Sequence, residues 1–144
     1  TGKLIVRGHD RLGRPVIWMR PARENTRSHD DNIRNVCFAL EKAVALMPPG
    51  VEKWCMVIDY NGYSMMNAPP MRTSRETLDI FMSHYPERLG CALLVDSPWL
   101  FGAAWTVLSG LMKEVTRNKV FWVKGAVGGP GSPKYDMFAQ HFDM

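Results

Sequence analysis

The side chains that most often carry catalysis or bind metals are present in this sequence, but they are widely spaced. Cys37, Cys55 and Cys91 each lie inside an apolar stretch, which is typical of buried free thiols. The four histidines are scattered along the chain, at positions 9, 29, 84 and 141. Because no pair of these residues has the spacing of a zinc site, we predict that the chain binds no metal.

Enzymatic chemistry is also poorly supported by the sequence. We find no nucleophile elbow and no paired general acid and base. Asp59 and Asp96 each follow an expected buried strand, at the sheet edge where α/β proteins bind ligands. Aspartate also favours the turns that begin at such positions, and this structural role is the favoured one. We predict that the chain is not an enzyme and needs no cofactor.

Two charged residues remain as candidates for ligand binding. Glu87 follows Pro86 and precedes Arg88, so its alternative role is a local ion pair of at most ~1 kcal/mol. Lys119 precedes an expected strand and is either a solvated edge lysine or a point cation for a phosphate. The residues alone leave these alternatives open.

Size and charge limit the class of protein. The 144 residues, 46% of them apolar, suit one domain over residues 1–144. No apolar run approaches the ~20 residues that span a bilayer, and the N-terminus does not resemble a signal peptide, so we expect a cytoplasmic protein. The net charge of +4 arises within residues 3–34. Such a basic stretch suits anionic lipid headgroups or phosphates, although most charge clusters are solvated surface.

The elements that position these residues alternate between strands and helices. Residues 4–7 and 16–19 predict a hairpin around the turn residues Asp10, Gly13 and Pro15. A helix capped by Ser28 or Asp30 follows and ends at Pro48. Its expected apolar stripe consists of Ile33, Val36, Cys37, Leu40, Val44 and Met47. This stripe is expected to pack on a sheet.

The second half of the chain continues the alternation. Residues 54–58, 91–95 and 120–123 predict strands, the first two buried on both faces. Thr73 and Glu76 have the spacing of a capping box that opens a helix, and Pro86 ends it. Residues 99–112 carry no charge, so they must be enclosed by protein or wall an apolar cavity. A last short helix covers residues 133–142. These elements predict an α/β fold with parallel strand pairs.

Five segments, in order and at matching spacing, resemble the CRAL-TRIO family. They are the turn DRLGRPV, the run MVIDYNGYS, the run YPERLG, the segment after Pro98 and the run NKVFWV. The family includes phosphatidylinositol/phosphatidylcholine transfer proteins, the retinaldehyde-binding protein and the α-tocopherol transfer protein. The resemblance implies a mixed, largely parallel sheet of about five strands flooring a hydrophobic cavity, with helices on its faces. It also implies a mobile helical gate and lipid exchange at membranes.

The resemblance also implies roles for particular residues. Glu87 and Lys119 match the glutamate and lysine that engage an inositol headgroup and its phosphate in phosphoinositide-binding members. Ser64 matches a hydroxyl of the choline-lipid site, but Met66 stands where a second donor is expected, so a phosphatidylcholine site is not supported. The sequence also begins at the first strand and stops at Met144. The given sequence therefore lacks the family's N-terminal helical bundle and its final strand, and we expect either an excised core or a reduced member whose cavity is less closed.

The uncharged run and the last helix are the predicted walls of the cavity. From the run we expect five residues to line it or to pack directly behind it: Trp99, Phe101, Trp105, Leu108 and Leu111. The last helix offers a stripe of Tyr135, Phe138 and Phe142, tethered by the flexible residues 128–131. We expect this stripe to act as a gate, either folded back over its own cavity or exchanged into a symmetric homodimer.

Together these features predict a domain that binds, and transfers or senses, a hydrophobic ligand such as a phosphoinositide. The expected partners are a phospholipid and, transiently, a membrane surface, with no role for nucleic acid. The alternative is a protein-interaction module that regulates a small GTPase or another partner through an apolar groove. The sequence leaves open the identity of the lipid and the choice between transfer and sensing.

Overall fold

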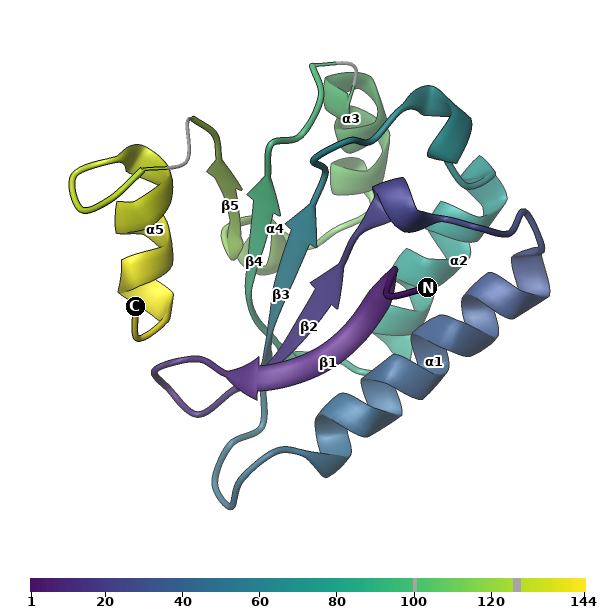
Figure 1. The fold of residues 1–144 in the computed structure, drawn as a ribbon. Coiled ribbons are helices and arrows are strands. Elements are labelled where there is room, and N and C mark those ends of the chain that lie inside the picture. The colour runs from purple at the N-terminus through teal and green to yellow at the C-terminus, as the bar shows by residue number, and fades with distance from the viewer. Residues whose placement is uncertain (100, 126–127) are drawn as a thin grey trace.

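A five-stranded sheet forms the centre of the computed structural model, which describes residues 1–99, 101–125 and 128–144 (Figure 1). The strands lie in chain order: β1 (Leu4–His9), β2 (Pro15–Met19), β3 (Trp54–Asp59), β4 (Leu89–Val95) and β5 (Val120–Val123). The first pair is antiparallel and every later pair is parallel. The predicted hairpin and the mixed, largely parallel sheet are therefore confirmed.

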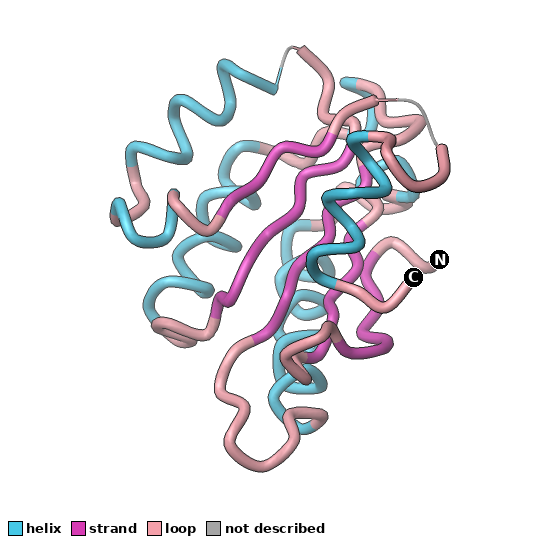
Figure 2. The backbone as a smooth tube through the Cα atoms, turned by 90° about the vertical axis from the view of Figure 1, so that its left-hand side faces the viewer, coloured by secondary structure: helices cyan, strands magenta, loops and turns pink. Residues whose placement is uncertain are grey.

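The order of the strands decides where the helices lie. Crossovers between parallel strands are right-handed, so strands that advance in one direction place their crossover helices on one face of the sheet. These helices are α1 (His29–Ala45), α2 (Met71–Ser83), α3 (Phe101–Gly110) and α4 (Glu114–Arg117). Among the helices of the described residues, α5 (Pro133–His141), which follows the last strand, is the one that covers the opposite face (Figures 1 and 2). Two short 3₁₀ helices, η1 (Pro21–Arg23) and η2 (Met65–Asn67), follow β2 and β3.

The larger part of the core lies between the sheet and the helices α1 and α2. The Ser28 side chain caps α1 by accepting a hydrogen bond from the backbone N–H of Asp31. Val36 and Leu40 of the predicted stripe are buried, and its other members pack partly buried beside them. The core residues of this face are Val6, Ile17, Val36, Ala39, Leu40, Ala43, Trp54, Met56, Ile80 and Ala92.

A second apolar cluster lies on the other face of the sheet. Because side chains alternate along a strand, β3 sends Trp54 and Met56 toward α1 but Cys55 and Val57 toward α5. The cluster consists of Val16, Cys55, Val57, Cys91, Leu93, Val95 and Val123. Phe138 of α5 and Phe142, the residue directly after α5, pack against it. Burial on both faces explains why the strand sequences are continuously apolar.

The prediction of a capping box at Thr73 and Glu76 is wrong. Helix α2 begins two residues earlier, at Met71, and Thr73 is a buried residue inside it. The Oγ1 atom of Thr73 lies 3.0 Å from Nδ1 of His29, and the Oε2 atom of Glu76 lies 2.8 Å from Nε2 of the same ring. Both polar side chains therefore join α2 to α1 in place of capping α2. The helix also ends at Ser83, before Pro86.

Candidate functional site

Helix α3 presents an apolar surface to solvent. Residues 99–112 carry no charge, and none of the described residues of α3 is buried. Trp99 is 84% exposed, Val107 43% and Leu111 50%. Val107 lies within the helix, whereas Trp99 lies in the turn before it and Leu111 in the turn after it. Among the described residues, no helix is both long enough and apolar enough to cross a membrane.

The inner side of α3 packs on two aromatic rings, one from Tyr60, just after β3, and one from Trp122 of β5. The Phe101 ring lies with its centroid 5.1 Å from that of Tyr60 and 5.8 Å from that of Trp122. The Trp105 ring meets Trp122 edge-on at 5.3 Å. Trp122 nevertheless remains 41% exposed. Burial in this aromatic group raises the pKa of Tyr60, and the nearby Tyr63 adds to the effect.

The five residues expected to line a cavity thus differ in their exposure. Phe101 and Trp105 face the sheet, and Leu108 is partly buried. Trp99 and Leu111 face solvent. Residue 100, which lies inside the uncharged run, falls outside the described residues. The cavity-lining role of all five stays a prediction.

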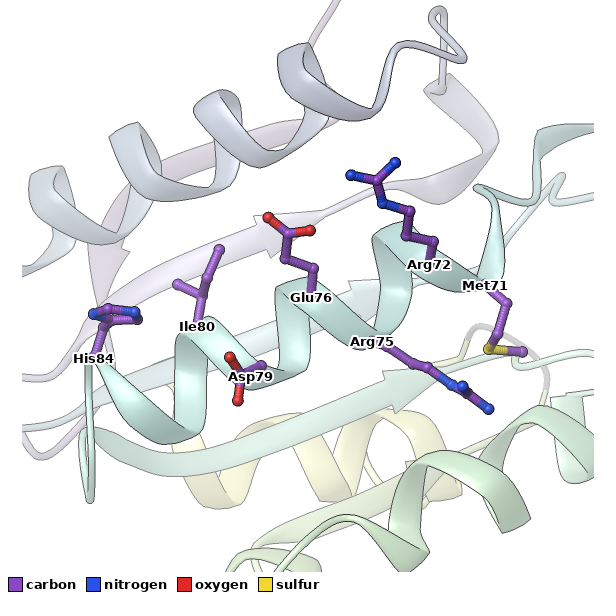
Figure 3. A pocket seen from close by; sticks show the side chains of 7 residues that line it. All are labelled: Met71, Arg72, Arg75, Glu76, Asp79, Ile80 and His84. Carbon is purple, nitrogen blue, oxygen red and sulfur yellow. The ribbon is translucent and has the colours of Figure 1, made fainter.

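Two surface hollows lie elsewhere. The larger, of about 730 Å³, runs along the outer side of α2, with Met71 and Arg75 pointing away from Arg72 and Glu76 (Figure 3). The smaller, of about 190 Å³, lies between residues 24–27 and residues 66–69. Charged side chains line the larger one, which does not suit an acyl chain. Neither hollow reaches α3 or α5, so the hydrophobic cavity also stays a prediction.

Glu87 and Lys119 lie near one another, at the ends where β4 and β5 begin. The Nζ atom of Lys53, just before β3, donates a hydrogen bond to the carbonyl oxygen of Glu87 at 2.7 Å. Burial and the nearby Lys53 cation lower the pKa of Lys119, and the charge of Glu87 partly offsets this. Glu87 itself has a positive φ of 60°, which is uncommon for a residue other than glycine. Lys53, to which no sequence pattern pointed, therefore belongs to this charged group.

Ser64 lies at the other end of the sheet. It follows the carboxyl end of β3 and precedes η2, where its Oγ atom is 3.0 Å from Oδ1 of Asn67. Lys53 stands at the amino end of the same strand, and a six-residue strand is roughly 20 Å long. Ser64 and the Glu87–Lys119 pair therefore cannot contact one small headgroup together. Met66, in the same turn as Ser64, is 81% exposed.

Helix α5 lies folded back on the sheet of its own chain. Phe142 stacks on Trp18 with ring centroids 6.4 Å apart, and Phe138 packs beside it. The third apolar contact comes from Met137, whereas Tyr135 is not part of the cluster. The gate role of Tyr135, Phe138 and Phe142, and their exchange into a homodimer, stay predictions.

Comparison with known proteins decides the family. The family model for the CRAL/TRIO domain matches residues 1–128. This chain belongs to the CRAL/TRIO domain family. The match extends from before β1 to beyond β5 and so contains the whole sheet.

Several relatives of this CRAL/TRIO chain are much longer. It is 38% identical over 120 residues to a CRAL-TRIO domain-containing protein of Schizosaccharomyces pombe, C23B6.04c, covering 83% of this chain and 12% of the relative. It is 30% identical over 127 residues to the phosphatidylinositol transfer protein PDR17 of Saccharomyces cerevisiae, and this match covers 85% of this chain and 36% of the relative. The crystal structure of Sfh5 has the same fold, with a TM-score of 0.70 and 22% identity over 84% of this chain and 46% of that one.

Proposed function

We propose that this chain binds a phospholipid and presents it at a membrane surface, as part of a lipid-transfer or lipid-sensing protein of the cytoplasm. One observation carries the proposal: the uncharged helix α3 and the turns on either side of it expose Trp99, Val107 and Leu111 to water. Extended apolar surface of this kind usually marks a binding site for a membrane, a ligand or a partner. Membership of the CRAL/TRIO family and the similarity to a phosphatidylinositol transfer protein support a lipid as the ligand of this surface.

The direction of α3 suggests how the lipid lies. The chain enters α3 from the carboxyl end of β4 and returns to the amino end of β5, so the helix runs antiparallel to both strands. An acyl chain lying along α3 and the partly exposed Trp122 would bring its headgroup toward Lys119. Each buried methylene contributes ~0.8 kcal/mol, so the chains supply most of the affinity.

The charged group at the amino ends of the strands supports an anionic headgroup. Lys119 and Lys53 are two cations close enough for one to lower the pKa of the other. A phosphate between them would relieve this repulsion. The carboxylate of Glu87 supplies an acceptor for headgroup hydroxyls, which suits an inositol better than a choline.

Lipid extraction from the purified chain, followed by mass spectrometry, tests the proposal. The chain is first incubated with vesicles that contain phosphatidylcholine and phosphatidylinositol, and is then reisolated by gel filtration. We expect about one phospholipid per chain, with phosphatidylinositol enriched over its share in the vesicles. A well-folded chain that takes up no lipid from these vesicles would overturn the proposal.

A further inference from the structure

Two buried thiols lie side by side on the sheet face that α5 covers. Cys55 of β3 and Cys91 of β4 are directly opposed in the register of the two parallel strands. Their Sγ atoms are 3.2 Å apart, and the residues are 0% and 2% exposed. Neighbouring strands lie ~4.8 Å apart, which falls within the range of Cα separations that a disulfide can bridge.

A buried ion pair stands beside these thiols. The carboxylate of Asp10, which is 6% exposed, accepts a hydrogen bond from Nε of Arg14 at 2.6 Å. The same carboxylate accepts the backbone N–H groups of Leu12 and Arg14 at 3.0 Å each. The Nη2 atom of Arg14 then reaches Sγ of Cys91 at 3.4 Å. The guanidinium is therefore fixed against one thiol of the pair.

The side chain of Arg14 packs against the backbone of Gly90, where a residue without a side chain is needed. A Cβ atom on Gly90, the residue before Cys91, would overlap the guanidinium of Arg14. Any larger residue at this position would thus displace the cation from the thiol.

The two thiols are chemically unequal. The hydrogen bond between the two thiols and the nearby Arg14 cation lower the pKa of Cys91, against the effect of burial. The same hydrogen bond and burial raise the pKa of Cys55. Thiolates rather than thiols react with peroxides and disulfides, so Cys91 has the properties of the attacking thiol and Cys55 those of the resolving thiol.

We propose that Cys55 and Cys91 form a reversible dithiol–disulfide pair that a small peroxide oxidises when α5 moves off the sheet. The Cys91 thiolate attacks one peroxide oxygen, the O–O bond breaks, and hydroxide leaves as water after taking a proton. The resulting sulfenic acid is attacked by Cys55, which forms the S–S bond and releases a second water. The sulfur pair loses two electrons and the peroxide gains them, and an external dithiol reverses the change.

Helix α5 controls access to this pair. Phe138 and Phe142 pack against the cluster that contains both cysteines, and Nδ1 of His141 lies 3.8 Å from Sγ of Cys91. A peroxide therefore reaches the thiols only after α5 is displaced. The disulfide in turn removes the thiolate that Arg14 and His141 face, so oxidation weakens one of the contacts that hold α5 down.

Metal binding fits this cluster less well. The ligand atoms of Asp10, Cys55 and Cys91 lie within 4.8 Å of one another. Both carboxylate oxygens of Asp10 already accept hydrogen bonds, and the Arg14 cation lies against this group. A metal ion would have to displace that cation.

The experiment treats the folded, reduced chain with hydrogen peroxide, blocks the remaining thiols and digests the product with trypsin without reduction. We expect the peptides 54–72 and 89–113, which carry Cys55 and Cys91, to appear as one disulfide-linked species that dithiothreitol separates. The peptide 35–42, which carries Cys37, should stay outside this species. In Cys55→Ala the linked species should disappear and Cys91 should accumulate as a dimedone-reactive sulfenic acid.

Two lysine variants in or near α5 test whether this helix controls the access of peroxide to the thiols. Lys134→Met removes the ion pair between α5 and Asp96 and should raise the oxidation rate several-fold. Lys124→Met, at an exposed lysine before α5, should leave the rate unchanged. The proposal is overturned if the linked species forms only in urea, or if the main product of the folded chain links Cys37. Equal rates in wild type and Lys134→Met would show that α5 does not control access.

Discussion

The Nζ atom of Lys134 lies 2.6 Å from Oδ2 of Asp96, so an ion pair joins α5 to the residue that follows β4. Both side chains are largely shielded, with 14% and 33% of their surfaces exposed. Asp96 has a positive φ of 51°, a conformation that aspartate tolerates better than most residues. The turn role expected for Asp96 is thus accompanied by a contact that fastens α5.

Loss of this ion pair should loosen α5 without unfolding the sheet. We expect Lys134→Met to destabilise the seated helix by about 1 kcal/mol, because the pair is partly shielded from water. Hydrogen exchange measured by mass spectrometry should then be faster in residues 133–141. Exchange in α1 should not change, and Lys124→Met should behave as wild type. Faster exchange throughout the chain would indicate a general fold defect.

Acid should also favour the displaced state of α5. Burial and the positive charge of Arg14 lower the pKa of His141, partly offset by Asp10. A displaced α5 has a histidine with the ordinary pKa of about 6.5, so between the lowered value and about 6.5 it binds more protons than the seated helix. Falling pH in that window therefore weakens the seating of α5.

The urea midpoint of unfolding, measured at about pH 7.5 and about pH 5.5, checks this dependence on His141. We expect the midpoint to fall more on acidification in wild type than in His141→Gln, which cannot be protonated. His84→Gln, at an exposed histidine, serves as the control and should keep the wild-type dependence. Identical curves for wild type and His141→Gln would contradict the expectation.

A charge on the exposed side of α3 should reduce binding to membranes. Val107 is 43% exposed on that side, so Val107→Lys adds no buried charge. We expect at least a several-fold weaker partition to phosphatidylcholine vesicles, since the new ammonium has to leave water. Phe38→Lys, at a residue of α1 that is 69% exposed, adds the same charge away from α3. If both variants lose binding equally, the surface of α3 is not the contact.

Removal of the Lys119 charge should weaken the binding of anionic lipids more than the binding of uncharged ligands. We expect Lys119→Met to lower uptake of phosphatidylinositol roughly tenfold while uptake of an uncharged apolar ligand stays near wild type. The reason is that the phosphate loses one of two neighbouring cations. Lys113→Met, at an exposed lysine beyond α3, is the matched control. A similar loss for both ligands would point to damage to the fold.

The core beneath α1 should tolerate little change. Leu40 is 0% exposed, and Leu40→Ala should lower the free energy of unfolding by about 2–5 kcal/mol through loss of contacts and a new cavity. Phe38→Ala, on the solvent side of the same helix, should cost less than about 0.5 kcal/mol. Urea unfolding of both variants checks the difference. A large effect at Phe38 would mean that its exposed surface is covered.

The spacing of apolar residues within single helices and strands predicted most of the fold. The 3.6-residue period of Val36 and Leu40 and the continuous apolar strand around Val57 predicted the helix and the buried sheet, because burial alone selects these residues. The prediction of a capping box at Thr73 was wrong because a polar side chain near the start of a helix can bind to a neighbouring helix as well as cap its own. His29 provides that neighbour, 44 residues earlier in the chain.

The contacts of the candidate site depend on strand register, which the sequence does not reveal. Cys55 and Cys91 lie in separate apolar stretches that look alike, yet pairing of β3 with β4 places them opposite each other. Lys53 likewise reaches Glu87 only because their strands are neighbours. A lysine just before each of two parallel strands is the one signal that could have linked Lys53 with Lys119.

The position of α5 in the chain also affects how the protein is made. A ribosome releases residues in order, and domains begin to fold while synthesis continues. In the described part of the chain, α5 follows the strands β1 to β5, so it can cover the face that carries Val57, Leu93 and Val123 only after residues 133–141 emerge. During that interval the nascent sheet offers an apolar surface to chaperones and to neighbouring chains. Slow translation of the segment after β5 would lengthen this exposure and increase aggregation, although the finished protein has the same sequence.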